Sequence, residues 1–284
     1  MKNEEVQKTV RERYGKIAKE SSSGCCGDSK ATLKISPCCG NSSTKVGSIS
    51  KQVGYTDADI NAVPEGANLG LGCGNPIALA SLKKGEVVLD LGSGAGFDCF
   101  LASEKVGAKG KVIGVDMTAE MLDKARENAR NGGYKNVEFR LGEIENLPAA
   151  DSSFDVIISN CVINLSVNKK RVFQEAFRVL KPGGRLMVSD IVILKELPDF
   201  IKESVDAYIG CVSGALQKDE YLRAIKAAGF EAVKVMGESI FPLDSFIDDP
   251  AAKVIMNDFK ITPEQVKNVS ASIASVKVQG MKPK

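Results

Sequence analysis

The sequence predicts an α/β fold with a parallel sheet and helices on both faces, plus an N-terminal segment and a smaller C-terminal α+β region. Short apolar runs alternate with amphipathic segments from about residue 86, and a glycine-rich turn follows the first run. This alternation is typical of βαβ units. We expect three regions: residues 1–60 as an N-terminal helix and flexible Cys-rich loop, residues 61–194 as the sheet domain, and residues 195–284 as a C-terminal region.

Hydrophobic patterning predicts the individual elements in chain order. Apolar runs predict strands at residues 87–91, 111–116, 137–141, 154–160 and 185–192. Apolar side chains at spacings of three and four predict helices at about 96–105, 118–131 and 169–180, and beyond the sheet domain at about 198–209 and 218–228, followed by a strand-like run at 232–236. Residues 21–54 lack this periodicity and predict a flexible loop.

Composition narrows the classes of function. The chain has 38 basic and 36 acidic side chains, a balance that argues against a nucleic-acid partner. No run approaches the roughly 18 apolar residues of a membrane span, and the N-terminus has no apolar leader region. We therefore expect a cytoplasmic monomer without a membrane partner. The sequence has no His, which removes the commonest general base and metal ligand.

The glycine turn after the first predicted strand indicates a nucleoside cofactor. Gly92, Gly94 and Gly96 allow a tight turn and a close approach of the backbone to a ligand. Asp116 ends the second predicted strand, where a carboxylate can accept both hydroxyls of a ribose. The glycines follow the pattern GxGxG, whereas sites for the pyrophosphate of a dinucleotide follow GxGxxG. The spacing therefore favours a cofactor without pyrophosphate.

Four motifs resemble the class I S-adenosylmethionine (SAM)-dependent methyltransferases in order and spacing: residues 89–96, 115–117, 154–157 and 180–184. The resemblance implies a Rossmann-like, SAM-binding domain over residues 61–194. It also implies the cofactor-binding residues, with Asp90 and the three glycines in the turn, Asp116 on the ribose, Met117 and Ile144 beside the adenine, Glu143 close by, and Asn160 at the methionine end.

The eight cysteines indicate the kind of substrate. In a reducing compartment such thiols are ligands, nucleophiles or packing residues. Cys161 directly follows the fourth predicted strand and emerges at the sheet edge that carries the glycine turn. Cys73 lies in a glycine-rich loop, Cys211 lies at a helix end, and Cys99 is expected to be a small core residue. Because thiolates select soft centres, we expect a thiophilic substrate rather than an alcohol or amine.

Segments around these cysteines resemble the arsenite methyltransferases: residues 33–38, 72–76, 160–165 and 210–215. The resemblance implies that Cys161 and Cys211 hold As(III), with Cys38 or Cys73 as a further thiol, and that the C-terminal region completes the arsenic site. The family's N-terminal and loop thiols match Cys38 and Cys73.

The choice of N-terminal thiol stays open. Cys38 and Cys39 are adjacent, and Cys25 and Cys26 form a second pair in the same predicted loop. An exposed thiol tail without a role in the chemistry is the alternative for both pairs.

The function that the resemblance implies is arsenic detoxification by transfer of methyl groups from SAM to thiolate-bound arsenite and methylarsenite. The arsenic lone pair attacks the methyl group, so no base is needed, which suits a chain without His. Methylation leaves arsenic pentavalent. Two enzyme thiols, preferably Cys38 with Cys73, would supply electrons by forming a disulfide that thioredoxin or glutathione reduces.

Two other functions fit parts of the pattern. A quinone or other small-molecule methyltransferase would share the cofactor motifs and the fold. A zinc-binding or thiol-based sensor would use the cysteines and treat SAM as a signal, although the sequence has no CxxC pair.

Overall fold

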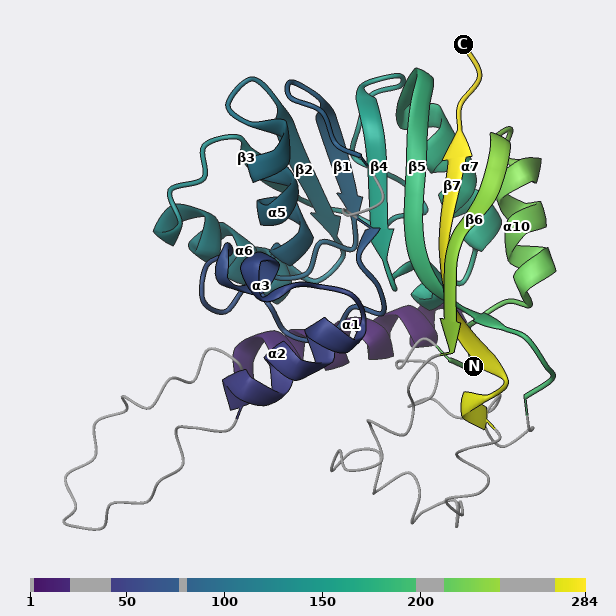
Figure 1. Ribbon diagram of the computed structural model, residues 1–284, viewed down its shortest axis with the longest axis horizontal. Coiled ribbons are helices and arrows are strands. Elements are labelled where there is room, and N and C mark those ends of the chain that lie inside the picture. Colours follow the sequence, from purple (N-terminus) through teal and green to yellow (C-terminus); the bar gives the residue numbers. More distant parts are fainter. Residues whose placement is uncertain (1–2, 21–41, 77–80, 198–211, 241–268) are drawn as a thin grey trace.

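A mixed seven-stranded sheet forms the centre of the computed structural model, which describes residues 3–20, 42–76, 81–197, 212–240 and 269–284 (Figure 1). The strand order is β3-β2-β1-β4-β5-β7-β6. In chain order the strands are β1 (Val87–Leu91), β2 (Lys111–Asp116), β3 (Val137–Leu141), β4 (Phe154–Asn160), β5 (Leu180–Ile193), β6 (Glu231–Ile240) and β7 (Ile273–Met281). Strands β1 to β5 are parallel, and β7 is antiparallel to both β5 and β6.

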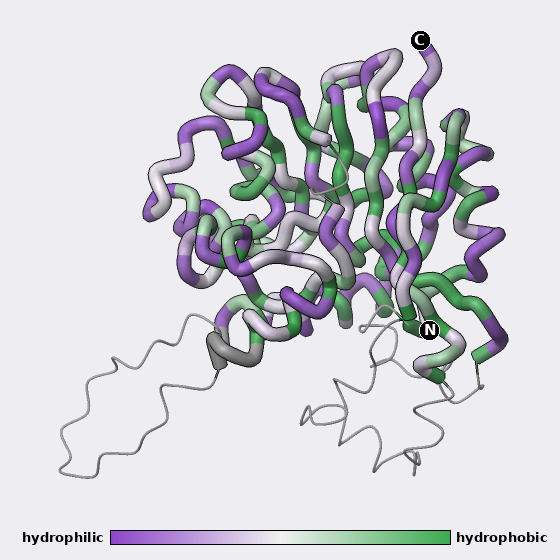
Figure 2. The backbone as a smooth tube through the Cα atoms, in the orientation of Figure 1, coloured by the Kyte–Doolittle hydropathy of each residue, from purple (hydrophilic) through white to green (hydrophobic). Residues whose placement is uncertain are grey.

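Helices cover both faces of the sheet. Helices α5 (Phe97–Val106) and α6 (Ala119–Asn131) pack on one face, and α7 (Lys169–Val179) and α10 (Lys218–Ala227) pack on the other. Successive residues of β1 point to opposite faces: Val88 belongs to the core cluster under α5 and α6, and Leu89 to the core cluster under α7 and α10. Both faces of the sheet are therefore buried under helices, and Figure 2 shows hydrophobic residues along the central strands.

The structure confirms the predicted fold class and most of its elements. Strands β1 to β4 have the predicted bounds, and β5 begins at Leu180 instead of Arg185. Strand β6 matches the predicted strand-like run, but β7 lies in residues for which patterning predicted no element. Both strands complete the sheet from within the predicted C-terminal region. The predicted helix at 198–209 lies outside the described residues.

The predicted loop at residues 21–54 is wrong over helix α2 (Ser42–Gln52). Gly47 and several Ser residues give this segment a poor intrinsic helix propensity. Tertiary contacts outweigh that propensity, because Val46 packs on the backbone of Gly70 and Ser50 exchanges a hydrogen bond with Asn68. A short helix, α3 (Asp57–Asn61), follows, and Thr56 begins it with a capping box.

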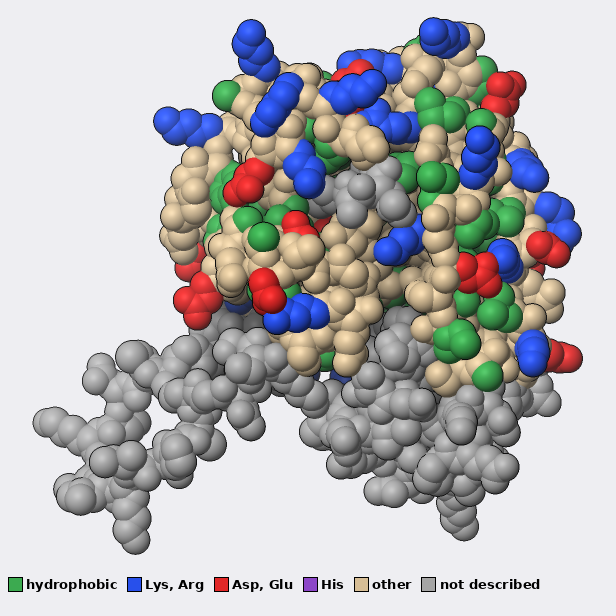
Figure 3. All heavy atoms as spheres, in the orientation of Figure 1, with side chains coloured by type: hydrophobic (Ala, Val, Ile, Leu, Met, Phe, Trp, Pro, Cys, Tyr) green, Lys and Arg blue, Asp and Glu red, His purple; other side chains and the backbone are tan. Residues whose placement is uncertain are grey.

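The carboxyl ends of the parallel strands point to the same side of the molecule, where α1 (Asn3–Glu20) and α2 lie across them (Figure 1). Acidic and basic side chains are interspersed on the face that Figure 3 shows, and apolar side chains gather over β6 and β7. No helix among the described residues is long and apolar enough to cross a membrane.

Candidate functional site

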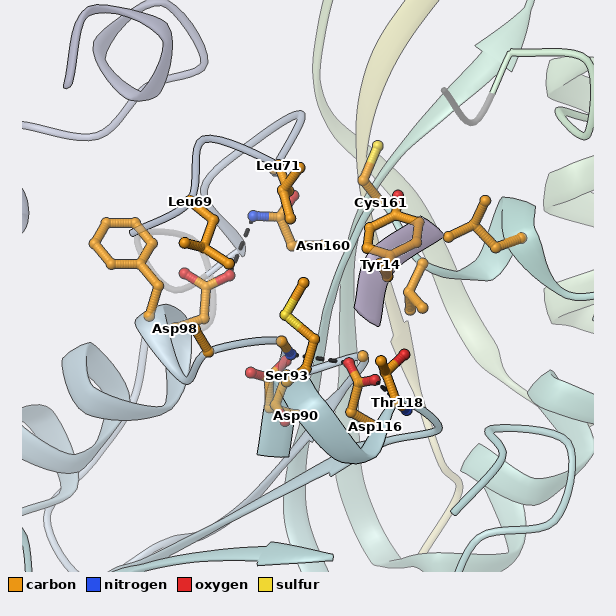
Figure 4. A pocket seen from close by; sticks show the side chains of 18 of the residues that line it. Tyr14, Leu69, Leu71, Asp90, Ser93, Asp98, Asp116, Thr118, Asn160 and Cys161 are labelled. Atoms are coloured by element: carbon orange, nitrogen blue, oxygen red, sulfur yellow. Dashed lines mark hydrogen bonds between the residues drawn. The ribbon is translucent and has the colours of Figure 1, made fainter. Parts of the chain in front are cut away.

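A pocket opens at the carboxyl ends of β1, β2 and β4, beside the point where strand order reverses between β1 and β4. Ligands of open α/β sheets bind at such points. The glycine turn, the end of β2 and the end of β4 form its floor and walls. Val10 and Tyr14 of α1 also line it, and Figure 4 shows the Tyr14 side chain beside Cys161.

The glycine turn has the conformation that its sequence predicts. Gly92, Gly94 and Gly96 have φ angles of 69°, 50° and 96°, in the left-handed region that favours glycine. A β-carbon on Gly92 would overlap Val162, whereas one on Gly94 would meet nothing within 4 Å. The backbone at Gly94 therefore faces open space that a ligand can fill.

Asp116 is fixed beside this turn by two backbone donors. Its Oδ2 accepts a hydrogen bond from Gly94 N at 3.0 Å, and its Oδ1 accepts one from Thr118 N at 2.8 Å. Burial raises the pKa of Asp116, and these hydrogen bonds oppose the rise. Ser93 Oγ lies in the same wall, buried and without a hydrogen-bond partner among the described residues. A carboxylate and an unsatisfied hydroxyl fit a ligand that carries a ribose and an amino-acid group.

Most of the predicted cofactor residues line this pocket. Besides the turn and Asp116, the lining includes the following predicted residues: Asp90, Met117, Ile144 and Asn160. Gly96 does not line it, because it begins α5 and a β-carbon there would press on Phe100 and Phe139. Glu143 does not line it either, because its carboxylate forms an ion pair with Arg11 of α1 at 3.2 Å.

A buried polar network that patterning did not predict lies in the wall of the pocket. Tyr55 OH donates to Asp98 Oδ1 at 2.6 Å, and Asn160 Nδ2 donates to Tyr55 OH at 2.8 Å and to Asp98 Oδ2 at 3.1 Å. Burial raises the pKa of Asp98 to about 6. All three residues line the pocket, so they supply a polar, partly anionic wall next to the glycine turn.

Asn160 also holds the loop that carries Cys73. Its Oδ1 accepts a hydrogen bond from Cys73 N at 3.0 Å, and its Nδ2 donates to Gly74 O at 2.8 Å. The loop packs so closely on β5 that a β-carbon on Gly74 would overlap Ser189 Oγ. One amide side chain therefore contacts both the polar wall of the pocket and the loop that carries Cys73.

Cys73 and Cys161 form a disulfide at the end of β4, with their Cα atoms 5.7 Å apart. Cys161 has a left-handed φ of 62°, which is uncommon for a residue with a side chain, and its N–H donates to Ser189 O at 2.8 Å. Of the two cysteines, Cys161 lines the pocket. Two predicted catalytic thiols, distant in the sequence, are therefore adjacent in the structure.

The remaining predicted thiols fall into two groups. Cys38 and Cys211, and with them the N-terminal alternatives Cys25, Cys26 and Cys39, lie outside the described residues, so the predicted pair of Cys38 with Cys73 and the predicted arsenic ligand Cys211 stay predictions. In the structure the partner of Cys73 is Cys161. Cys99 is fully buried in the core, as expected, and its thiol donates to Asp90 Oδ2 at 3.2 Å.

Another buried carboxylate, that of Asp190, lies behind the disulfide. Asp190 of β5 is fully buried, and burial raises its pKa to about 7. Its Oδ1 accepts hydrogen bonds from Asn164 Nδ2 at 2.8 Å and from Ile191 N at 3.0 Å, and its Oδ2 accepts one from Tyr221 OH at 3.1 Å. This network connects β5 to η1 (Ile163–Leu165) and α10.

Sequence reasoning missed Tyr55, Asp98 and Asp190 because none belongs to a motif that it used. Asp98 follows the glycine turn by two residues, and that proximity was the single available signal. Tyr55 and Asp190 reach the site through folding of distant segments, so only the assembled sheet identifies them.

Comparison with known proteins agrees with this geometry. Residues 82–229 match the model of a family described as a methyltransferase domain. The chain is 52% identical over 235 residues to an arsenite methyltransferase of Halobacterium salinarum, covering 82% of this chain and 59% of that protein. It resembles the crystal structure of an arsenic(III) SAM methyltransferase from Chlamydomonas reinhardtii with a TM-score of 0.58 and 32% identity, covering 84% of this chain and 73% of the other.

A quinone methyltransferase is similar over a smaller part. The 2-phytyl-1,4-beta-naphthoquinone methyltransferase of Arabidopsis thaliana is 38% identical over 117 residues, which is 40% of this chain and 45% of that protein. The chain spans about three fifths of the length of the arsenite methyltransferases that it matches, 59% of the archaeal protein and 59% of one from Homo sapiens.

Proposed function

Because this chain belongs to the methyltransferase domain family, we propose that it transfers methyl groups from SAM to trivalent arsenic held by cysteine thiolates. The observation that carries the proposal is the position of Cys161, whose side chain lines the same pocket as the glycine turn and Asp116. A thiophilic substrate on Cys161 would lie in the pocket that receives the cofactor. The similarity to proteins named arsenite methyltransferase supports arsenite and methylarsenite as that substrate.

The cofactor half of the pocket would bind and orient SAM, which supplies an electrophilic methyl group on a sulfonium. Asp116 would accept the ribose hydroxyls, with both of its oxygens already aligned by Gly94 N and Thr118 N. Met117 and Ile144 would flank the adenine. Asp98 and Asn160 would face the cationic amino-acid end, because their polar groups lie on the other side of the turn.

The thiol half would hold arsenic without help from a base. As(III) bound to thiolates keeps its lone pair, which attacks the methyl carbon, so no proton has to leave the nucleophile. Cys161 and Cys211 would be the arsenic ligands, with Cys38 or Cys73 as the third. Rate enhancement would then come mainly from alignment of arsenic with the methyl group.

The disulfide implies that a reductant acts before arsenic binds. A dithiol gives two electrons and two protons to the Cys73–Cys161 bond and leaves both side chains as thiols, which frees Cys161 for arsenic. After methylation, reduction of pentavalent arsenic needs two electrons, and oxidation of two enzyme thiols to a disulfide supplies them. Thioredoxin or glutathione in a reducing cytoplasm would close this cycle.

The test is an assay of the purified chain with arsenite, SAM and a dithiol reductant, in which methylated arsenic is separated by chromatography and counted by elemental detection. We expect turnover in the parent chain and none in Cys161→Ser or Cys211→Ser. Cys99→Ser is the matched control, because Cys99 lies in the core and not in the pocket. Turnover in Cys161→Ser would contradict the proposal, and Cys73→Ser should bind arsenic yet turn over poorly.

A quinone methyltransferase is the second candidate. The described pocket does not favour it, because methylation of a quinol needs no thiolate ligand and so does not explain the thiol pair at the end of β4. Methylation of a quinol without methylation of arsenite, in the same assay, would favour it over the proposal.

A further inference from the structure

Two sulfurs and a carboxylate meet in the protein interior behind Cys161, which lines the pocket. The Sγ atoms of Cys73 and Cys161 and a carboxylate oxygen of Asp190 all lie within 4.8 Å of one another. Relative exposures of 3%, 7% and 0% show that all three residues are buried. Within the described part of the chain, no other trio of Cys, Asp and Glu side chains is grouped in this way.

Asp190 is oriented as metal-binding carboxylates are. Ligating carboxylates are held in place by hydrogen bonds from surrounding donors. Asn164 Nδ2 and Ile191 N both donate to Asp190 Oδ1, whereas among the described residues Oδ2 receives one hydrogen bond, from Tyr221 OH. Oδ2 therefore keeps an acceptor site that these donors do not use.

We propose that, once the disulfide is reduced, Cys73, Cys161 and Asp190 bind a divalent cation that prefers sulfur ligands, such as Zn²⁺. A dithiol first gives two electrons and two protons to the disulfide, and the two thiols release their protons when the cation binds. Zinc takes thiolate sulfur and carboxylate oxygen in a tetrahedron whose ligand atoms lie about 3.3–3.8 Å apart. Reduction lets the two sulfurs separate to that spacing, and the carboxylate oxygen already lies within 4.8 Å of both.

Cys161 lines the pocket, so the pocket gives the cation a path of entry, and a tetrahedral site with three protein ligands leaves its fourth position to water. Cys161 is also the arsenic ligand in the proposed function. The cation and arsenite would therefore exclude one another, so that free zinc would lower the rate of arsenite methylation. This consequence, unlike the site itself, rests on the proposed function.

The test is a titration of the reduced full-length chain with Cd²⁺ alone, as a spectroscopic probe for Zn²⁺. The parent for this test carries Ser in place of the other thiols outside the described residues, Cys25, Cys26, Cys38, Cys39 and Cys211, and a phosphine serves as reductant so that no added thiol competes. We expect one Cd²⁺ per chain with a thiolate charge-transfer absorption band, and none in the disulfide form. Asp190→Asn should weaken binding by about tenfold or more.

Cys99→Ser is the matched control, because Cys99 and Asp90 form a second buried pair of thiol and carboxylate in the same fold, with one sulfur instead of two. It should leave the titration unchanged. Equal affinity in Asp190→Asn and its parent would overturn the inference, as would an equal loss in Cys99→Ser. If Asp190→Asn does not fold, Cys73→Ser replaces it and should abolish stoichiometric binding.

A second measurement uses the unaltered eight-cysteine chain. Zn²⁺ should slow alkylation of Cys73 and Cys161, followed by mass spectrometry, while Cys99 stays unreactive in the core with or without metal. Alkylation of Cys73 and Cys161 at the same rate with and without Zn²⁺ would overturn the inference. Neither experiment contains SAM or arsenite, so failure here leaves the proposed methyl transfer intact, and failure of that assay leaves this site intact.

Discussion

The two halves of the pocket are built in different ways. In the cofactor half, the turn at Gly92–Gly96 and the carboxylate of Asp116 come from one βαβ unit, and backbone N–H groups position the carboxylate. In the thiol half, Cys73, Cys161 and Asp190 come from three distant segments. A local motif can hold a common cofactor, whereas a site for an unusual substrate depends on contacts across the whole sheet.

Removal of the Asp116 carboxylate should have the largest effect, confined to the cofactor half. Each hydrogen bond to a charged group contributes about 1.5–3 kcal/mol, so loss of the two proposed ribose contacts in Asp116→Ala should weaken SAM binding by roughly 1,000-fold in calorimetry. The Cys73–Cys161 disulfide, counted by thiol titration, should persist. Asp123→Ala is the control, because Asp123 is exposed and pairs with Arg126. Loss of the disulfide in Asp116→Ala would show that the halves are not independent.

The Asp98 carboxyl, which lines the cofactor half of the pocket, should make stability depend on pH. Burial raises its pKa from 3.8 to about 6, so the folded state favours the protonated form. The raised pKa contributes up to about 3 kcal/mol to the free energy of unfolding. This contribution is fully present below about pH 4 and is lost as the pH rises through 6. In urea unfolding of the cofactor-free protein, Asp98→Asn should therefore gain stability relative to the parent between pH 4 and pH 7.

A difference between parent and Asp98→Asn that stays constant over this range would contradict the raised pKa. Asp57→Asn is the control, because Asp57 is exposed and forms an ion pair with Lys51 at the start of α3.

A methyl group added to the loop that carries Cys73 should disturb the thiol half of the pocket and leave the cofactor half intact. A β-carbon on Gly74 would overlap Ser189 Oγ, and such overpacking costs about 1–3 kcal/mol. In Gly74→Ala we expect partial loss of the disulfide, measured by mass spectrometry, and Ser189→Gly in the same chain should restore it.

The comparison variant is Gly94→Ala, where a β-carbon meets open space in the cofactor half. It should strain the left-handed turn by about 1–2 kcal/mol and impair SAM binding, yet keep the disulfide. A disulfide as complete in Gly74→Ala as in the parent would contradict the close packing of this loop.

Removal of the ion pair between α1 and the cofactor half should have the smallest effect on SAM binding. Arg11 and Glu143 are both about half exposed, and exposed pairs contribute at most about 1 kcal/mol. Arg11→Ala should weaken SAM binding by less than about fivefold, and the difference should vanish at high salt. Lys8→Ala, which removes a pair within α1, should have no effect on SAM binding. A large effect that salt does not reduce would assign Arg11 a direct role.

The sequence by itself determined the fold class, the five parallel strands and the cofactor half of the pocket. Periodicity and glycine spacing are properties of neighbouring residues, so the turn at Gly92–Gly96 and the carboxylate at the end of β2 were predictable before any contact was known. The cysteines at the loop and strand ends also indicated a thiophilic substrate.

Only the tertiary structure decided which groups meet. It paired Cys73 with Cys161, joined Tyr55 and Asp98 through Asn160, placed Asp190 behind the disulfide and made α2 a helix. These outcomes depend on the register of β4 against β5 and on packing between segments far apart in the chain. Such contacts leave no periodic trace in the sequence, because a buried carboxylate or a paired thiol is specified by its surroundings and not by its neighbours along the chain.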